Sequence, residues 1–211
     1  MGKVMNQGYE LSIKWADKFK DFRYWVNANV SYAKNKIIYM DEVKHVNDFN
    51  NQTGRSTGLT YGYVFDRFYT AEDFADVDKG ILKDDLPVVT IGTPFPGDCK
   101  YVDMDNNGKI DANDRTYLGY STQRPEYVFG FDYGFNWKGW DFSMQWTGAT
   151  HVSRNLETEY RIPFSPNGKR ALLQFQADER WTEETAATAT MPRFSENLSL
   201  IHISEPTRLR R

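Results

Sequence analysis

Apolar and polar residues alternate along four stretches of the chain. In the first, 9–15, every second residue is apolar, and the same pattern returns in 22–33 after a polar break at 17–21. The apolar positions are Tyr9, Leu11, Ile13 and Trp15, then Phe22, Tyr24, Val26, Ala28, Val30 and Tyr32, although Trp25 and Ala33 interrupt the polar side. A period of two predicts strands with one apolar face, and the short break predicts a hairpin.

A second hairpin is predicted over 127–147. Its first stretch, 127–137, has an aromatic residue at every odd position, and Lys138-Gly139 then provides a two-residue turn with glycine where positive φ is needed. The return stretch places Trp140, Phe142, Met144 and Trp146 on one face and polar residues on the other. The six aromatics of the first stretch are Tyr127, Phe129, Phe131, Tyr133, Phe135 and Trp137.

The length of these strands suits a membrane. Eleven residues at about 3.3 Å each, tilted by about 45°, cross roughly 25 Å, the height of the apolar band of a membrane barrel. A soluble antiparallel sheet with one buried face also alternates. Six successive aromatics would overfill a sandwich core, however, so the pattern favours a lipid-facing wall whose opposite face lines an aqueous lumen.

Loop lengths agree with a barrel. Both turns within the hairpins are short, whereas about ninety residues separate Lys36 from Tyr127. Outer-membrane barrels have short periplasmic turns and long external loops. We therefore expect an all-β protein, an antiparallel transmembrane β-barrel fragment with about four barrel strands in two hairpins. The extracellular loop would cover about 37–126, with a short β segment around 61–68.

The composition is more typical of a protein whose aromatic residues lie at an interface between apolar and aqueous surroundings than of a protein with a large buried core. Aromatic residues make up 16% of the chain, yet the mean hydropathy is −0.68. A net charge of −3 gives no basic surface for nucleic acid, so we expect no such partner. Cys99 is the only cysteine and cannot form an internal disulfide. The chain has neither a membrane-helix run nor a signal peptide, so an exported protein would lack its start here.

Residues 103–114 match a calcium-binding loop. Oxygen ligands recur at positions one, three, five, nine and twelve, glycine occupies position six, and position seven offers a backbone carbonyl. The predicted ligands of a structural Ca²⁺ are Asp103, Asp105, Asn107, Lys109, Asp111 and Asp114. Position twelve is Asp rather than Glu, and no helical period flanks the loop. The alternative is an acidic surface turn held by Asx hydrogen bonds. At position eight, Ile110 should anchor the loop to an apolar contact.

Several segments together resemble the SusC/RagA family of TonB-dependent outer-membrane transporters. They cover nearly the whole chain to about Asn197, although Glu183 stands where the family usually has proline. The segments are 2–11, 31–37, Gly97-Asp98, Lys100 through the calcium-type loop to Arg115, Gly119-Tyr120, Pro125 with the aromatic strand, 138–141, 180–182 and 191–193.

The resemblance implies an outer-membrane importer of oligosaccharides or peptides. It would form a lipid-embedded barrel closed by a plug, be driven by the TonB complex through that plug, and be lidded by a SusD-like surface lipoprotein. The plug and the TonB box are absent from this sequence. No residue identifies the substrate.

The end of the chain departs from this pattern. Residues 198–211 resemble the translation of a transposon-type sequencing adapter, so we expect 1–197 to be the partial barrel and 198–211 a non-native tail. The alternative is a basic native tail ending in Arg208, Arg210 and Arg211. Before it, 169–181 has the pattern of a short amphipathic helix with Leu172, Leu173 and Phe175 inward.

Two other classes of function fit the sequence less well. The chain contains no nucleophile elbow and no Cys/His zinc spacing, and loop carboxylates are usually solvated rather than a glycosidase pair, so we expect no enzyme. The remaining alternative is a soluble, secreted, calcium-stabilised carbohydrate-binding β module. It would explain the rings and the metal loop, but not the polar opposite faces of four strands.

Overall fold

The computed structural model describes residues 2–155, 160, 163 and 171–194. They form two compact units. Unit 1 contains residues 1–43, 52–59 and 119–153, and unit 2 contains 44–51, 60–118 and the part of the chain from Arg154 onward. The predicted tail, 198–211, lies outside the described residues. No helix among the described residues is long and apolar enough to cross a membrane.

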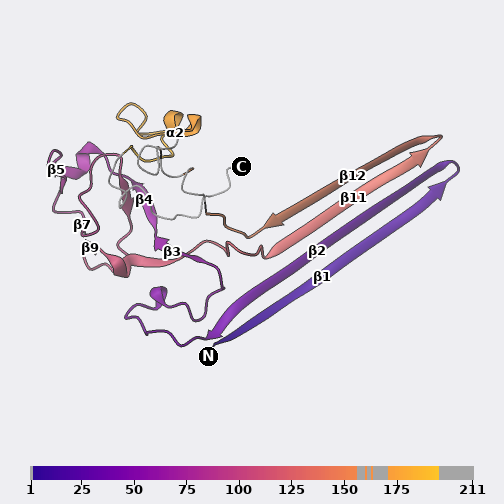
Figure 1. The fold of residues 1–211 in the computed structure, drawn as a ribbon, viewed down its shortest axis with the longest axis horizontal. Helices are drawn as coiled ribbons and strands as arrows, with labels where there is room; N and C mark the ends of the chain where they lie inside the picture. The colour runs from indigo at the N-terminus through magenta and orange to yellow at the C-terminus, as the bar shows by residue number, and fades with distance from the viewer. Residues whose placement is uncertain (1, 156–159, 161–162, 164–170, 195–211) are drawn as a thin grey trace. The chain divides into compact units, whose positions relative to one another are not determined.

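Unit 1 is a four-stranded antiparallel sheet in the order β1-β2-β11-β12 (Figure 1). Its strands are β1 (Lys3–Phe19), β2 (Phe22–Tyr39), β11 (Tyr127–Trp137) and β12 (Trp140–Thr150). Both predicted hairpins are confirmed, as is the all-β antiparallel class. The turn between β11 and β12 has positive φ at Lys138 (45°) and Gly139 (86°), as a primed turn requires.

The first hairpin is longer than the sequence predicted. Pairing continues through Asp17↔Tyr24 and Lys18↔Arg23 to Phe19↔Phe22, which leaves only Lys20 and Asp21 in the turn. The predicted break at 17–21 was therefore too wide. Backbone hydrogen bonds do not require apolar side chains, and Lys20 adopts the positive φ (53°) that closes a tight turn.

The two hairpins join because β2 pairs with β11 along eleven residues, from Tyr127↔Tyr32 to Trp137↔Phe22. Directly opposed residues share a face of the sheet. The three registers place all the predicted apolar positions of the four strands on one face, which we call the apolar face. One row across it is Ile13, Ala28, Phe131 and Trp146. The alternation predicted separately in each strand thus adds up to a single surface.

The apolar face is open. Trp15, Trp146 and Trp140 are 60, 56 and 73% exposed, and Leu11 and Ile13 are exposed as well. A patch of this extent is far larger than soluble monomers usually leave in water. The rings therefore do not form the buried core of a sandwich within this sheet.

The opposite face, which we call the polar face, carries hydrophilic and small residues. On it the Asn27 side-chain amide donates a 2.6 Å hydrogen bond to the Asp132 carboxylate. Trp25, which interrupts the polar pattern, lies over Gly134: a Cβ on this glycine would be 2.3 Å from Trp25 Cζ2. Glycine at 134 thus makes room for the Trp25 ring on this face.

Unit 2 is built from short strand pairs. Antiparallel pairs join β3 (Thr60–Tyr63) to β10 (Arg115–Leu118), β4 (Phe65–Phe68) to β8 (Cys99–Tyr101), and β5 (Phe74–Asp76) to β6 (Ile81–Leu82); β7 (Val88–Val89) and β9 (Lys109–Ile110) are parallel. The 3-10 turns are η1 (Asp48–Asn50), η2 (Ala71–Asp73) and η3 (Ala112–Asp114). The β segment expected around 61–68 is confirmed as β3 and β4, which pair with different partners.

The core of unit 2 is small. Tyr63, Tyr101 and Ile110 are buried together, with Val89 and Ile91 packed against them. So few apolar residues stabilise little by themselves, and charged pairs supplement them. Arg67 makes a two-pronged ion pair with Asp73, each bond 2.6 Å long. This pair joins β4 to the turn before β5.

The helix expected over 169–181 is shorter than predicted. Among the described residues it is α2 (Gln174–Asp178), and residues 169–170 lie outside them. The fully buried side chain is Gln176, not the predicted leucines. Its Oε1 accepts a 3.0 Å hydrogen bond from the Leu173 backbone N–H, so it caps the helix start while Leu173 precedes the helix.

We expect Gly134→Ala to destabilise the sheet by about 1–3 kcal/mol, because the added methyl group meets Trp25 and the Phe142 carbonyl oxygen, 2.5 Å away. Gly130→Ala is the matched control, since the three atoms nearest to its methyl group would all belong to the Asn29 side-chain amide, which can rotate away. Urea unfolding in detergent, followed by tryptophan fluorescence, measures both. Equal unfolding midpoints for the two variants would contradict the role given to Trp25.

The Arg67–Asp73 pair predicts a loss of stability in acid. Hydrogen bonds from Arg67 are the main cause that lowers the pKa of Asp73 from 3.8 to about 2. A carboxyl whose pKa is depressed by folding stabilises the fold above pH 4 and loses this contribution as the pH falls towards 2. The free energy of unfolding should fall by about 1–2 kcal/mol over this range. The decrease stays this small because water screens the exposed part of Arg67.

Hydrogen exchange at the Lys83 amide, which bonds the Asp73 carbonyl oxygen at 3.0 Å, reports on this region. Asp73→Asn should lower protection at neutral pH and remove the acid-dependent loss between pH 4 and 2. An unchanged acid dependence in this variant would show that another group is responsible.

Candidate functional site

The calcium-type loop is held in place by β7 and β9. Val88 N–H donates to the Gly108 carbonyl oxygen at 3.0 Å, and Thr90 N–H donates to that of Ile110 at 3.0 Å. Ile110 is 1% exposed and belongs to the core with Tyr63 and Tyr101, so its predicted anchoring role is confirmed. Gly108, at position six, has φ of 79°, which explains why glycine is needed there.

Three predicted ligands converge. The carboxylates of Asp103, Asp105 and Asp114 each place an oxygen within 4.8 Å of the others. Asp114 has no exposed surface, and its burial, together with the nearby charges of Asp105 and Asp103, raises its pKa. Two backbone N–H groups, from Met104 and Asp111, donate to it at 2.8 and 2.7 Å and offset part of this rise.

The other three predicted ligands are placed differently. The Asp111 carboxylate accepts a 2.7 Å hydrogen bond from Asn113 N–H and caps η3, so it is not part of the converging group. Asn107 Oδ1 accepts from Lys109 N–H at 2.8 Å, and its amide donates to Asp105 at 3.1 Å. Lys109 lies in β9 beside Val88. Such Asx bonds occur with or without metal, so they do not distinguish the two interpretations.

A buried ion pair joins two distant segments of unit 2. Arg193 Nε donates to Asp98 Oδ1 at 2.7 Å, and the Arg193 backbone N–H donates to the Gly97 carbonyl oxygen at 3.0 Å. Asp98 is 1% exposed; its burial raises its pKa, and Arg193 opposes the rise. The Trp181 ring lies against Gly97, so closely that a Cβ there would be 2.5 Å away. Both segments stood out as motifs in the sequence, but no sequence signal indicated that they meet.

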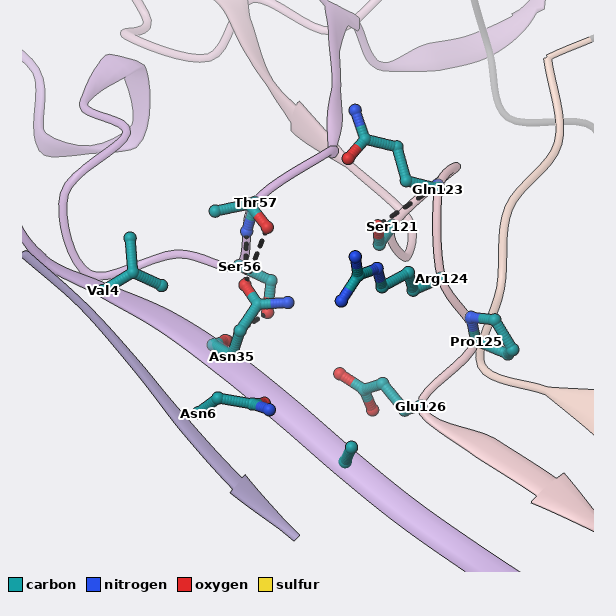
Figure 2. Close-up of a pocket in the computed structure, with 11 residues that line it drawn as sticks. Val4, Asn6, Asn35, Ser56, Thr57, Ser121, Gln123, Arg124, Pro125 and Glu126 are labelled. Carbon is teal, nitrogen blue, oxygen red and sulfur yellow. Dashed lines mark hydrogen bonds between the residues drawn. The ribbon is translucent and has the colours of Figure 1, made fainter.

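A cavity of about 360 Å³ opens in unit 1 where β1 and β2 meet the segments 56–57 and 121–126 (Figure 2). It lies on the polar face, since Asn6 and Asn35 are directly opposed on the two strands at positions of that face. The sequence did not predict this site, because its residues come from four separate stretches with no motif spacing. The lining residues are Val4, Asn6, Ala33, Asn35, Ser56, Thr57, Ser121, Gln123, Arg124, Pro125 and Glu126.

Two curated proteins of Formosa agariphila are similar to the chain in sequence. TonB-dependent receptor P3 is 26% identical over 157 residues, which is 68% of this chain, and TonB-dependent receptor P26 is 26% identical over 204 residues, which is 92% of it. The chain spans only 15% and 19% of the length of these relatives. No protein-family model matches the chain.

Solved structures agree on the fold. A structure of the RagAB peptide importer in the open-open state aligns with a TM-score of 0.59 at 16% identity, and one of the RagAB peptide transporter with 0.60 at 15%. Each alignment covers 92% of this chain and 20% of the other. At such identities these matches concern the fold alone. Together with the sequence relatives, they confirm the resemblance: the chain is similar to a segment of a SusC/RagA-like TonB-dependent transporter.

Proposed function

We propose that the chain is part of an outer-membrane importer of oligosaccharides or peptides, driven by TonB and lidded by a SusD-like surface lipoprotein. The observation that carries this proposal is the four-stranded sheet with one mainly apolar face, whose rings are largely exposed, and one mainly polar face. Acyl chains would cover the first, and the water of a transport lumen would meet the second. The names of the sequence relatives support TonB as the energy source.

A peptide substrate is supported by the structural similarity to RagAB, which is a peptide importer. An oligosaccharide remains the other substrate class in the proposal. The soluble sugar-binding module is disfavoured because the apolar residues extend across all four strands rather than lining a local groove, and a soluble protein would hold this face in water. Catalysis has no part in the proposal.

Adjacent residues of β12 test the lipid-facing assignment. Met144 and Gln145 lie near the middle of the strand, on the apolar and polar faces respectively. Met144→Arg should destabilise the folded protein by about 2–4 kcal/mol, because a charge would meet hydrocarbon, whereas Gln145→Arg should have little effect. The amount of folded complete importer in isolated outer membranes measures both.

Equal levels of the two variants would refute the lipid-facing wall. The transport activity itself is measured as solute uptake by intact cells with and without TonB. Uptake that is unchanged without TonB would refute the energy source.

We also propose that the loop 103–114 binds a structural Ca²⁺ through Asp103, Asp105 and Asp114, with Asn107 and the Lys109 carbonyl completing the ring and Asp111 acting through a water molecule. Support comes from the buried Asp114, which faces two other carboxylates without a cation among the described side chains. A divalent ion would offset this repulsion. The preferred ion is calcium, because it accepts six to eight oxygen ligands in flexible geometry.

Calcium titration of the metal-stripped importer by calorimetry tests this site. Asp103→Asn should weaken binding by roughly tenfold or more, because it removes one charged ligand. Asp78→Asn is the matched control, an exposed carboxylate of unit 2 outside the loop, and should leave binding unchanged. No heat of binding at millimolar calcium in the unmodified protein would remove the metal site and leave the Asx-bonded turn.

A further inference from the structure

The cavity on the polar face has one charged group that its surroundings do not neutralise. Glu126, which contributes to the lining, is already paired: Lys34 Nζ lies 3.3 Å from its Oε1, and His151 Nδ1 lies 3.1 Å from its Oε2. Within the part of the chain that the structure describes, the guanidinium of Arg124 has neither an ion pair nor a hydrogen-bond partner. The cavity therefore has an uncompensated positive charge at Arg124.

Asn35 adds an oriented donor. Its Oδ1 accepts hydrogen bonds from Thr57 N–H at 2.7 Å and from Thr57 Oγ1 at 3.0 Å. Since a backbone N–H can only donate, this contact fixes which end of the Asn35 amide is oxygen. The Nδ2 group is left facing the cavity, and Figure 2 shows it pointing toward the Arg124 guanidinium from the opposite side.

We propose that this cavity is a subsite for the acidic group, a carboxylate or a sulfate, of an imported solute. The Arg124 guanidinium would bind two oxygens of the group side by side, and Asn35 Nδ2 would donate to one of them. Asn6 and Gln123, at the cavity edge, offer amide groups that suit the polar parts of the same solute. The proposal rests on the import function proposed above, because the polar face must line the lumen for a solute to reach it.

Geometry favours an anion over a neutral solute. A guanidinium without a partner gains more from a charged acceptor than from a hydroxyl group, because charge-assisted hydrogen bonds are roughly twice as strong. The carboxylate of Glu126 does not cancel this preference, since both of its oxygens already face a basic nitrogen. A volume of about 360 Å³ accommodates one sugar unit or one to two amino-acid residues.

The test compares matched acidic and neutral probes on the complete importer. The pairs are hexagalacturonate and its methyl ester, a sulfated dextran oligosaccharide and the unsulfated one, and a tetrapeptide with a central glutamate and the same peptide with glutamine. The variant is Arg124→Gln. The control is Arg23→Gln, which removes an arginine of β2 that lies on the polar face at the other end of the sheet.

We expect the unmodified importer to bind the acidic member of at least one pair about tenfold or more tightly than the neutral member, as a charge-assisted contact would give. Arg124→Gln should abolish this preference, and Arg23→Gln should keep it. The pair that shows the preference identifies the source of the acidic group, as uronate, sulfate ester or acidic peptide.

Two results overturn the subsite: no acidic preference in any pair, or a preference that survives in Arg124→Gln. Uptake by intact cells separates this failure from failure of the proposed function. If a neutral probe is taken up in a TonB-dependent way, but the preference for acidic probes does not depend on Arg124, only the subsite is refuted. Absence of TonB-dependent uptake of every probe refutes the import function and the subsite with it.

Discussion

The antiparallel pairing of β2 with β11 is the interaction on which unit 1 depends. The two strands are far apart in sequence, yet they pair residue for residue over the full length of β11, which satisfies backbone groups that each marginally stable hairpin would leave unpaired. The register also decides which side chains share a face. A slip by one residue would move the ring of Phe131 to the face on which Asn27 and Asp132 form a hydrogen bond. Because the apolar face is exposed, its energetics depend on the medium: acyl chains would solvate the rings, whereas water would favour association between molecules.

Unit 2 is organised by a different principle. Its apolar core is small, and ion pairs between arginines and buried carboxylates add to it. Arg67 and Asp73 connect β4 to the β5 turn, and Arg193 reaches Asp98 with its side chain and Gly97 with its backbone. Removing the arginine of such a pair leaves the buried carboxylate uncompensated, which costs more than the intact pair contributes. A calcium ion bound at Asp114 would likewise compensate the charge of a buried carboxylate.

The sequence by itself determined the four strands of unit 1, the second turn and the calcium-type spacing. A period of two reports directly which side chains share a face, and a glycine with positive φ is a local requirement, so both can be read without knowing the neighbours. Ile110 was correctly assigned for the same reason. The wide turn at 17–21 was wrong because side-chain polarity does not report where backbone pairing stops.

Only the tertiary structure decided which distant residues meet. The contact of Trp25 with Gly134, the Asp98–Arg193 pair and the cavity with Arg124 and Asn35 each join stretches that no spacing rule connects. Tertiary structure also decided that Asp111 caps η3 while Asp103, Asp105 and Asp114 converge. Such contacts depend on strand register and chain path, and these follow from the packing of the whole chain rather than from any one segment.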